Sequence, residues 1–320
     1  MLALVVVATA LVGVAFSSAE PRPGPGFTNV GNFAPSWSPD ARSIAFAGYA
    51  ARHAQIYAVD IAGTRVRRLT HDSANDFAPI WLHDGRLAFR GQDAGQDFVA
   101  FLDRSGRTVK VPWLTGDLDW SPDGERIVYT VDDQQIPQQQ LWVANADGSG
   151  ARMIVPDAGH DGANPDWSPD GKRIAYVAGA NTDKRTIHLV NADGSGDRRL
   201  TRAGHEWFPD WSPDGKKIVY AEGAFGRDHY NLAVTDADGT NARDLTPLRS
   251  WDDTSPAWSP NGALIAFTST RSGKSRGLGH ETRRHTAPQS HVRRLHDHRH
   301  EPLGTAHWHV APGRHLCLRR

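Results

Sequence analysis

The residues best suited to binding chemistry are histidines and carboxylates that recur in short polar segments along the chain. Each segment lies within ten residues before a tryptophan, and together they contain His71, Asp72, Asp117, His160, Asp161, His205, Glu206, Asp252 and Asp253. Imidazole and carboxylate groups bind cations, basic peptides and sugars. We therefore expect a ligand or partner face where the fold gathers these segments, although ordinary solvated loops have the same composition.

The sequence offers no second set of residues for catalysis. Gly148-Ser149-Gly150 and Gly194-Ser195-Gly196 lack the spacing of a nucleophile elbow, and there is no P-loop, dinucleotide fingerprint or His-Glu-x-x-His. The segment 236–241 contains Asp-Gly but lacks the ligand pattern of an EF-hand. We expect a binding protein that is not an enzyme, with no catalytic residue and no obligatory cofactor. The ring of acids and histidines would also suit a divalent cation.

A repeat that fills most of the chain must position these polar segments. Trp-Ser-Pro begins at residues 37, 120, 167, 211 and 258, and Trp81 followed by Leu-His-Asp-Gly fills the gap between the first two. Successive tryptophans are 44, 39, 47, 44 and 47 residues apart. A fixed period of this length, with several short strands in each unit, is typical of a β-propeller.

Each repeat predicts four strands joined by tight turns. In the best-preserved copy, Trp167 ends the first strand and Ser-Pro-Asp-Gly predicts a type I turn. Apolar runs at 174–176 and 187–190 predict the second and third strands, and Arg-Arg-Leu-Thr at 198–201 predicts the fourth. We predict an all-β propeller of four-stranded blades, about six in number with the last one incomplete. Its polar connections between blades would gather on one face around the axial channel.

The Trp-Ser-Pro-Asp-Gly unit, with its following Ile-Ala-Phe or Ile-Val-Tyr strand, resembles the TolB-like β-propeller repeat over residues 31–276. The resemblance implies a non-enzymatic, exported propeller that binds a protein or peptide partner as a scaffold of the bacterial envelope. We expect no α/β domain before this propeller, in contrast to the family's namesake. Related propellers include polysaccharide and oligosaccharide lyases and the propellers of certain hydrolases. A metal or sugar in the axial channel is therefore the alternative.

The amino-terminal residues predict export. Residues 1–19 contain an apolar run without a charge followed by Ser-Ser-Ala, which is typical of a cleaved signal peptide and short for a membrane span. Residues 20–30 form a Pro/Gly-rich spacer. A periplasmic or extracellular protein without a membrane span in the mature chain follows, with a retained anchor as the alternative. Basic and acidic residues number 36 each, so net charge gives no case for nucleic acid binding.

Residues 277–320 depart from the repeat, with nine of the sixteen histidines, eight arginines and three acids. We expect a disordered tail that leaves sheet edges exposed. Read one nucleotide later, its degenerate codons permit a third strand with an Asp-Gly turn at 277–287, a fourth strand at 288–292 and another Trp-x-Pro-Asp-Gly at 309–315. This order favours a frameshift near 274–277. A genuine tail and a metal-binding histidine module are the alternatives.

Overall fold

The computed structural model describes twelve segments of the chain, and all of their regular structure is β-strand. The segments are residues 34–50, 53–102, 108–111, 116–131, 140–155, 163–179, 185–202, 204–223, 229–246, 252–269, 306–311 and 314–319. The predicted signal peptide and spacer, and the part of the tail before residue 306, lie outside them. Within these segments, no helix has the length and apolarity that crossing a membrane requires.

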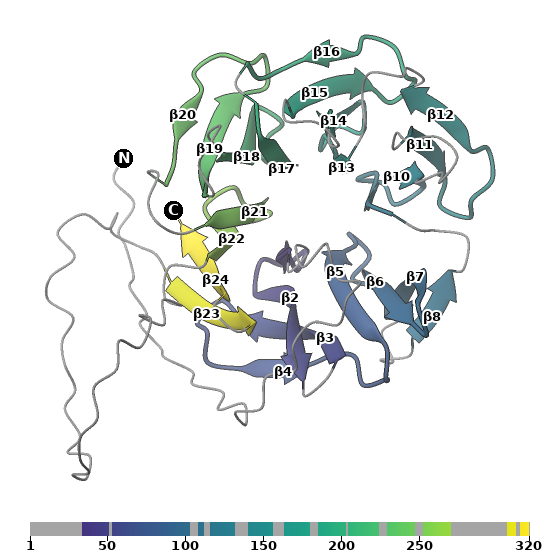
Figure 1. Ribbon diagram of the computed structural model, residues 1–320, viewed down its shortest axis with the longest axis vertical. Helices are drawn as coiled ribbons and strands as arrows, with labels where there is room; N and C mark the ends of the chain where they lie inside the picture. The colour runs from purple at the N-terminus through teal and green to yellow at the C-terminus, as the bar shows by residue number, and fades with distance from the viewer. Residues whose placement is uncertain are drawn as a thin grey trace, which may run out of the picture.

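Five four-stranded sheets follow one another along the chain and stand around a common axis, with the first strand of each nearest that axis (Figure 1). Consecutive strands pair antiparallel. Blade 1 has β1 (Ser36–Trp37), β2 (Ser43–Ala50), β3 (His53–Asp60) and β4 (Val66–Arg68); blade 2 has β5 (Asn75–Trp81), β6 (Leu87–Asp93), β7 (Gln96–Leu102) and β8 (Thr108–Val111). Blade 3 has β9 (Leu118–Trp120), β10 (Arg126–Val131), β11 (Gln140–Asn145) and β12 (Arg152–Val155); blade 4 has β13 (Ala163–Trp167), β14 (Arg173–Ala178), β15 (Thr186–Asn191) and β16 (Arg198–Arg199). Blade 5 has β17 (Glu206–Trp211), β18 (Lys217–Gly223), β19 (Tyr230–Asp236) and β20 (Arg243–Asp244).

A sixth sheet completes the ring and corrects two expectations. It contains β21 (Asp253–Trp258) and β22 (Ile265–Ser269), followed by β24 (Arg314–Arg319) and then β23 (Ala306–Ala311). Five blades of consecutive strands and one sheet finished by the chain end therefore replace the predicted six blades with an incomplete last one. Residues 306–311 and 314–319 are strands instead of disordered tail, because the edge of β22 needs backbone partners and these segments supply them. The frameshift remains a prediction.

Aromatic and aliphatic side chains between neighbouring sheets form the core. Between blades 4 and 5, for example, Val177 and Leu200 pack with Trp211 and Tyr220 in one buried cluster. Burying one large aromatic side chain stabilises a fold by about 2–3 kcal/mol, so the repeated tryptophan contributes much of the adhesion between blades. The ring closes where the indole Nε1 of Trp37 donates a hydrogen bond of 3.1 Å to the carbonyl of Ala257.

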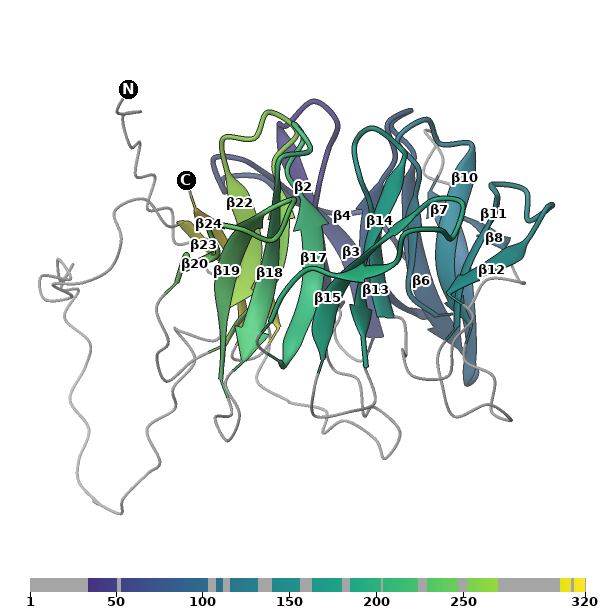
Figure 2. The ribbon, with the colours of Figure 1, turned by 90° about the horizontal axis from the view of Figure 1, so that it is seen from above.

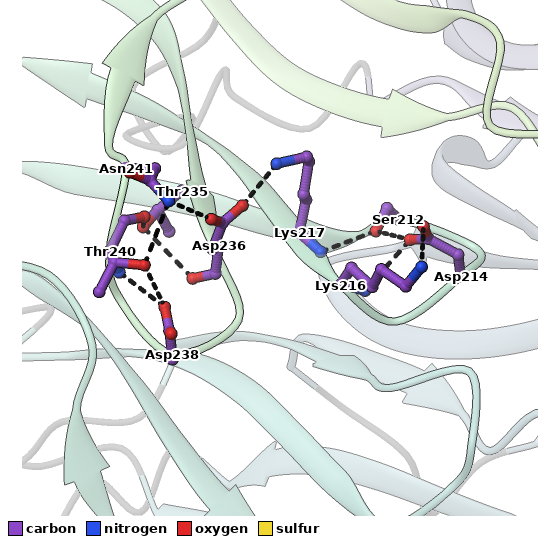
Figure 3. Close-up of polar contacts among 9 residues, drawn as sticks. All are labelled: Ser212, Asp214, Lys216, Lys217, Thr235, Asp236, Asp238, Thr240 and Asn241. Carbon is purple, nitrogen blue, oxygen red and sulfur yellow. Dashed lines mark hydrogen bonds and ion pairs between the residues drawn. The ribbon is translucent and has the colours of Figure 1, made fainter.

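The Ser-Pro-Asp-Gly segments form the predicted tight turns between the first and second strands. In blade 5, the Ser212 hydroxyl donates to the Asp214 carboxylate at 2.7 Å and accepts the Lys217 amide at 2.9 Å (Figure 3). The same carboxylate accepts the Lys216 amide at 3.1 Å, and Gly215 takes a φ of 69° that disfavours a side chain. The motif is therefore explained by hydrogen bonds within the turn.

A β-bulge within the innermost strand is a second repeated feature. The residue three positions before the tryptophan has a positive φ in four sheets, at Ala78, Asn164, Phe208 and Ser255. The register of the first strand against the second shifts at the same place in each. Bulges of this kind re-aim the side chains that follow. Here each bulge lies just before the tryptophan and the residue that precedes it.

Antiparallel pairing divides the loops between two faces of the propeller (Figure 2). We call one the turn face, because it carries the Ser-Pro-Asp-Gly turns and the Asp-Gly turns between third and fourth strands. The other, the connection face, carries the links between blades and between second and third strands. Of the nine predicted site residues, the seven that the structure describes lie at the connection-face ends of the blades, in the links or at the first residue of an inner strand.

Candidate functional site

The first two predicted residues, His71 and Asp72, are exposed on the connection face between blades 1 and 2. The Asp72 carboxylate accepts the backbone amide of Ala74 at 3.1 Å, which orders the link without burying the acid. Both side chains are therefore presented to solvent, as a ligand or partner face requires. His160 and Asp161 lie outside the described residues.

Asp117 is a structural connector between three blades. Its Oδ1 accepts Nη1 of Arg90 in blade 2 at 2.9 Å. Its Oδ2 accepts the backbone amide of Asn164 in blade 4 at 3.2 Å and Nδ2 of the same residue at 2.9 Å. The left-handed φ of Asn164 turns both of these donors toward the carboxylate. The hydrogen bonds that a ligand would need from Asp117 are thus made to protein groups.

His205 and Glu206 are adjacent in sequence but differ in their surroundings. Glu206 is 1% exposed, and its Oε2 accepts the Ile187 amide at 3.0 Å and the hydroxyl of Thr201. Burial raises the pKa of Glu206 to about 7, opposed by these two hydrogen bonds and reinforced by the charge of Glu222. Glu206 therefore belongs to the junction between blades 4 and 5 and is not on the surface.

His205 lies beside two side chains that the sequence did not single out. Its Nδ1 is 3.4 Å from Nη2 of Arg185, and the Arg185 guanidinium lies 4.5 Å from the ring centroid of Trp207. All three side chains are half-buried at the connection-face end of blades 4 and 5. We call this set the Arg185 patch. A cation stacked on an indole next to an imidazole is suited to a carboxylate or aromatic group of a partner.

Asp252 and Asp253 are also adjacent in sequence and differ in burial. Asp252 is half-buried, accepts the Tyr230 amide at 3.1 Å and lies 3.6 Å from Nδ1 of His229. Asp253 is 1% exposed and accepts the Ser269 hydroxyl at 2.5 Å. The predicted ring therefore splits in two. One part is exposed or half-buried on the connection face, and the other part is buried and hydrogen-bonded within the fold.

The turn face uses its acids within its own turns. Asp238 accepts the Thr240 amide at 2.9 Å and its hydroxyl at 2.6 Å, and Asp236 accepts Nδ2 of Asn241 at 2.6 Å and Nζ of Lys217 at 2.5 Å (Figure 3). These hydrogen bonds lower the pKa of both carboxyls. Segment 236–241 is a turn whose carboxylates already have partners. Across the described segments, no group of three His, Cys, Asp or Glu side chains is arranged to hold a metal ion.

The sequence reasoning missed a further set of carboxylates, those directly before the inner tryptophans of blades 3, 4 and 5. Each accepts the backbone amide of the next sheet's tryptophan: Asp119 that of Trp167 at 2.8 Å, Asp166 that of Trp211 at 2.7 Å, and Asp210 that of Trp258 at 2.7 Å. The signal was present in the repeated Asp-Trp pair. It could have been found by comparing the residue before each tryptophan across the repeats.

The family of the chain follows from a match over more than half of its length. Residues 103–280 match the model of the TolB beta propeller domain. The chain belongs to the TolB beta propeller domain family. This agrees with the repeated Trp-Ser-Pro-Asp-Gly turns and the four-stranded blades described above.

Three individual proteins illustrate the likeness. The Tol-Pal system protein TolB of Anaeromyxobacter dehalogenans (strain 2CP-C) is 33% identical over 106 residues, which cover 32% of this chain and 24% of that protein. The crystal structure of TolB from Acinetobacter baumannii superposes with a TM-score of 0.61 at 20% identity, covering 74% of this chain and 59% of that one. An oligogalacturonate lyase in complex with manganese gives 0.53 at 17% identity, covering 74% and 73%. The two structures show the shared fold, and the chain spans less than two thirds of either TolB relative.

Proposed function

We propose that this protein is an exported, non-enzymatic β-propeller that binds a protein or peptide partner on its connection face and acts as a scaffold in the bacterial envelope. Membership of the TolB beta propeller domain family supports this proposal, as does the relative named as a Tol-Pal system protein. The predicted signal peptide supports a periplasmic or extracellular location. Detection of the protein in the periplasmic fraction or the medium, and not in the cytoplasm, tests the location.

The Arg185 patch is the observation that carries the partner-binding proposal. Arginine and tryptophan are enriched among the residues that dominate protein interfaces, because they bury a large area and also offer a charge or an N–H group. The stacked pair of Arg185 and Trp207 combines both residues at a half-buried position, with His205 adjacent. A partner segment with a carboxylate beside an apolar or aromatic side chain matches this chemistry.

Site-specific photo-crosslinking in the native cell tests the proposed face. The crosslinking amino acid is placed at Arg202, which is exposed in the link that leads to His205, or at Lys216, which is exposed on the turn face of blade 5. We expect one discrete adduct from position 202 and none from position 216. The Arg185→Ala variant should abolish the adduct, whereas Arg86→Ala should retain it, since Arg86 stacks over Phe101 near the opposite face. Equal adducts from both positions, or an adduct that Arg185→Ala leaves intact, would contradict the proposal.

The enzymatic alternative is a polysaccharide or oligosaccharide lyase with a divalent cation in the axial channel. This alternative is supported by the likeness in fold to the manganese-bound oligogalacturonate lyase. Incubating the purified protein with oligogalacturonate and Mn²⁺ distinguishes the two functions. A lyase releases unsaturated sugars that absorb in the ultraviolet, and a scaffold leaves the substrate unchanged.

A further inference from the structure

The residue directly before the inner tryptophan occupies the same place in all six sheets. From the first sheet to the sixth it is Ser36, Ile80, Asp119, Asp166, Asp210 and Ala257. The three acids belong to consecutive blades, and the innermost strands surround the axis (Figure 1). Three carboxyl groups therefore lie together on one side of the propeller's centre, while the other side has neutral residues.

These carboxyl groups form a series of hydrogen bonds across three junctions. Asp119 connects blade 3 to blade 4, Asp166 connects blade 4 to blade 5, and Asp210 connects blade 5 to the sixth sheet, each through the next tryptophan's backbone amide at 2.7–2.8 Å. Between blades 1 and 2, the hydroxyl of Ser36 accepts the Trp81 amide at 2.9 Å. A neutral acceptor is therefore sufficient for this hydrogen bond. The junctions do not need the negative charge that the three acids can carry.

The acids also interact with one another. A hydrogen bond between the side chains of Asp119 and Asp166 lowers the pKa of Asp119 and raises that of Asp166, so Asp166 is the carboxyl that keeps a shared proton. Burial raises the pKa of Asp119 to about 6 and that of Asp210 to about 8. Burial and the charges of its two neighbours hold the pKa of Asp166 well above its usual range.

Other charged groups on the adjoining elements face different partners. On the innermost strands and their approaches, Asp117 is paired with Arg90, and Glu206 and Asp253 are buried against Thr201 and Ser269. At the turn-face end, the guanidinium groups of Arg126 and Arg173 each lie 4.7 Å from a tryptophan ring centroid, those of Trp167 and Trp211. Within the set, the charges of Asp210 and Asp119 raise the pKa of Asp166, and the charge of Asp119 raises that of Asp210.

We propose that Asp119, Asp166 and Asp210 are a proton-sharing set that makes the junctions from blade 3 to the sixth sheet sensitive to pH. When the set holds its protons, the carboxyl groups accept the tryptophan amides and hydrogen-bond to each other. When it ionises, like charges are held close together at half-buried positions, and the three junctions loosen. The junction held by Ser36 does not respond. This inference does not depend on the proposed partner.

The direction of the pH effect follows from the raised pKa values. A carboxyl whose pKa is higher in the folded than in the unfolded protein favours folding most below its unfolded value, here 3.8. That contribution is lost as the pH rises through the folded values, from about 6 to about 8. The protein should therefore become less stable between pH 5 and pH 8.5.

Thermal unfolding of the full chain tests the proposal, with EDTA present so that no divalent cation neutralises the set. The wild type is compared with the triple variant Asp119→Asn, Asp166→Asn and Asp210→Asn, in which each amide oxygen can still accept the tryptophan amide. From pH 5 to pH 8.5, we expect the Tm of the wild type to fall by at least about 5 °C more than that of the variant. Glu206 is present in both proteins, so its titration cancels. Asp214→Asn on the turn face is the control and should keep the wild-type trend. Equal trends in wild type and triple variant would overturn the proposal.

Amide hydrogen exchange gives a second measurement that needs no variant. After correction for the intrinsic effect of pH on exchange, protection of the Trp167, Trp211 and Trp258 amides should decrease between pH 5 and pH 8.5. Protection of the Trp81 amide, which Ser36 accepts, should decrease less. The same decrease at all four amides would also overturn the proposal.

Discussion

Replacing Asp117 by alanine would show whether this residue serves the partner or the fold. As a ligand-face residue, it would affect binding and leave stability unchanged. In the structure it instead makes three hydrogen bonds, to Nη1 of Arg90 and to the amide and side chain of Asn164, at 2.9–3.2 Å. The substitution therefore removes a carboxylate that joins blades 2, 3 and 4.

The magnitude can be worked out from these contacts. A hydrogen bond to a charged group contributes about 1.5–3 kcal/mol to stability, so three of them at the low end of that range give about 4–5 kcal/mol. The side chains of Asp117 and Arg90 are 20% and 19% exposed, so solvent screening lowers the contribution of their ion pair below this sum. We expect Asp117→Ala to lower the free energy of unfolding by about 3 kcal/mol. Asp117→Asn, which keeps the shape and one acceptor, should cost about 1–2 kcal/mol.

Urea unfolding followed by tryptophan fluorescence measures the effect as a lower midpoint at an unchanged m-value. A double-mutant cycle with Arg90→Ala should give a coupling energy of about 1 kcal/mol between the two side chains. Asp72→Ala is the control, because Asp72 is exposed and accepts one amide, and it should cost about 0.5 kcal/mol or less. A loss below 1 kcal/mol for Asp117→Ala, or no coupling with Arg90, would refute this account of Asp117.

Three further outcomes are expected. Glu206→Gln should be more stable than wild type by up to about 3 kcal/mol at pH 8.5 and about as stable as wild type at pH 5. The reason is that the stability contributed by protonated Glu206 is lost as the pH rises through about 7. Urea titrations at pH 5 and pH 8.5 check this. Gly239→Ala should destabilise the protein by about 2–3 kcal/mol, and Gly85→Ala by about 1 kcal/mol. Both glycines have a positive φ, but a Cβ at Gly239 would lie 2.7 Å from the Leu200 carbonyl oxygen, whereas a Cβ at Gly85 would have nothing within 4 Å. Paired thermal melts measure the difference. Ending the chain at residue 305 should expose the edge of β22 and increase self-association, which sedimentation velocity detects as larger species.

The repeat predicted the blades because its signals are local. Ser212, Asp214 and Gly215 form their turn through contacts within five residues, so the same letters give the same turn wherever they occur. The alternating second and third strands pair with their neighbours across short links. An all-β propeller follows from such local contacts once the period is recognised.

The candidate site was less predictable, because its residues act between repeats. Glu206 and Asp253 stand five positions before Trp211 and Trp258, as the buried Asp76 does before Trp81. As polar loop residues they were expected on the surface, whereas Glu206 is buried against Ile187 and Thr201 of the preceding blade, and Asp253 is buried with Ser269 as its partner. Composition alone does not distinguish the two places. A comparison of equivalent positions does, since an acid at a fixed distance from a core tryptophan is expected in the same environment each time.

The sixth sheet shows what decides strand pairing where the repeat stops. In the five blades, the third and fourth strands follow the second in chain order, but in the sixth sheet β24 pairs with β22 and β23 takes the outer place. The five pairs from Ile265 with Arg319 to Ser269 with His315 owe nothing to the repeat, because the tail has neither its Asp-Gly turn nor its Arg-Arg-Leu-Thr strand. These pairs provide backbone hydrogen-bond partners for the edge of β22, and any segment able to form a strand could provide them. The same argument explains why a frameshifted tail and a genuine one would both be drawn to this edge. Sequencing of the coding DNA, and not the pairing of the strands, is what distinguishes them.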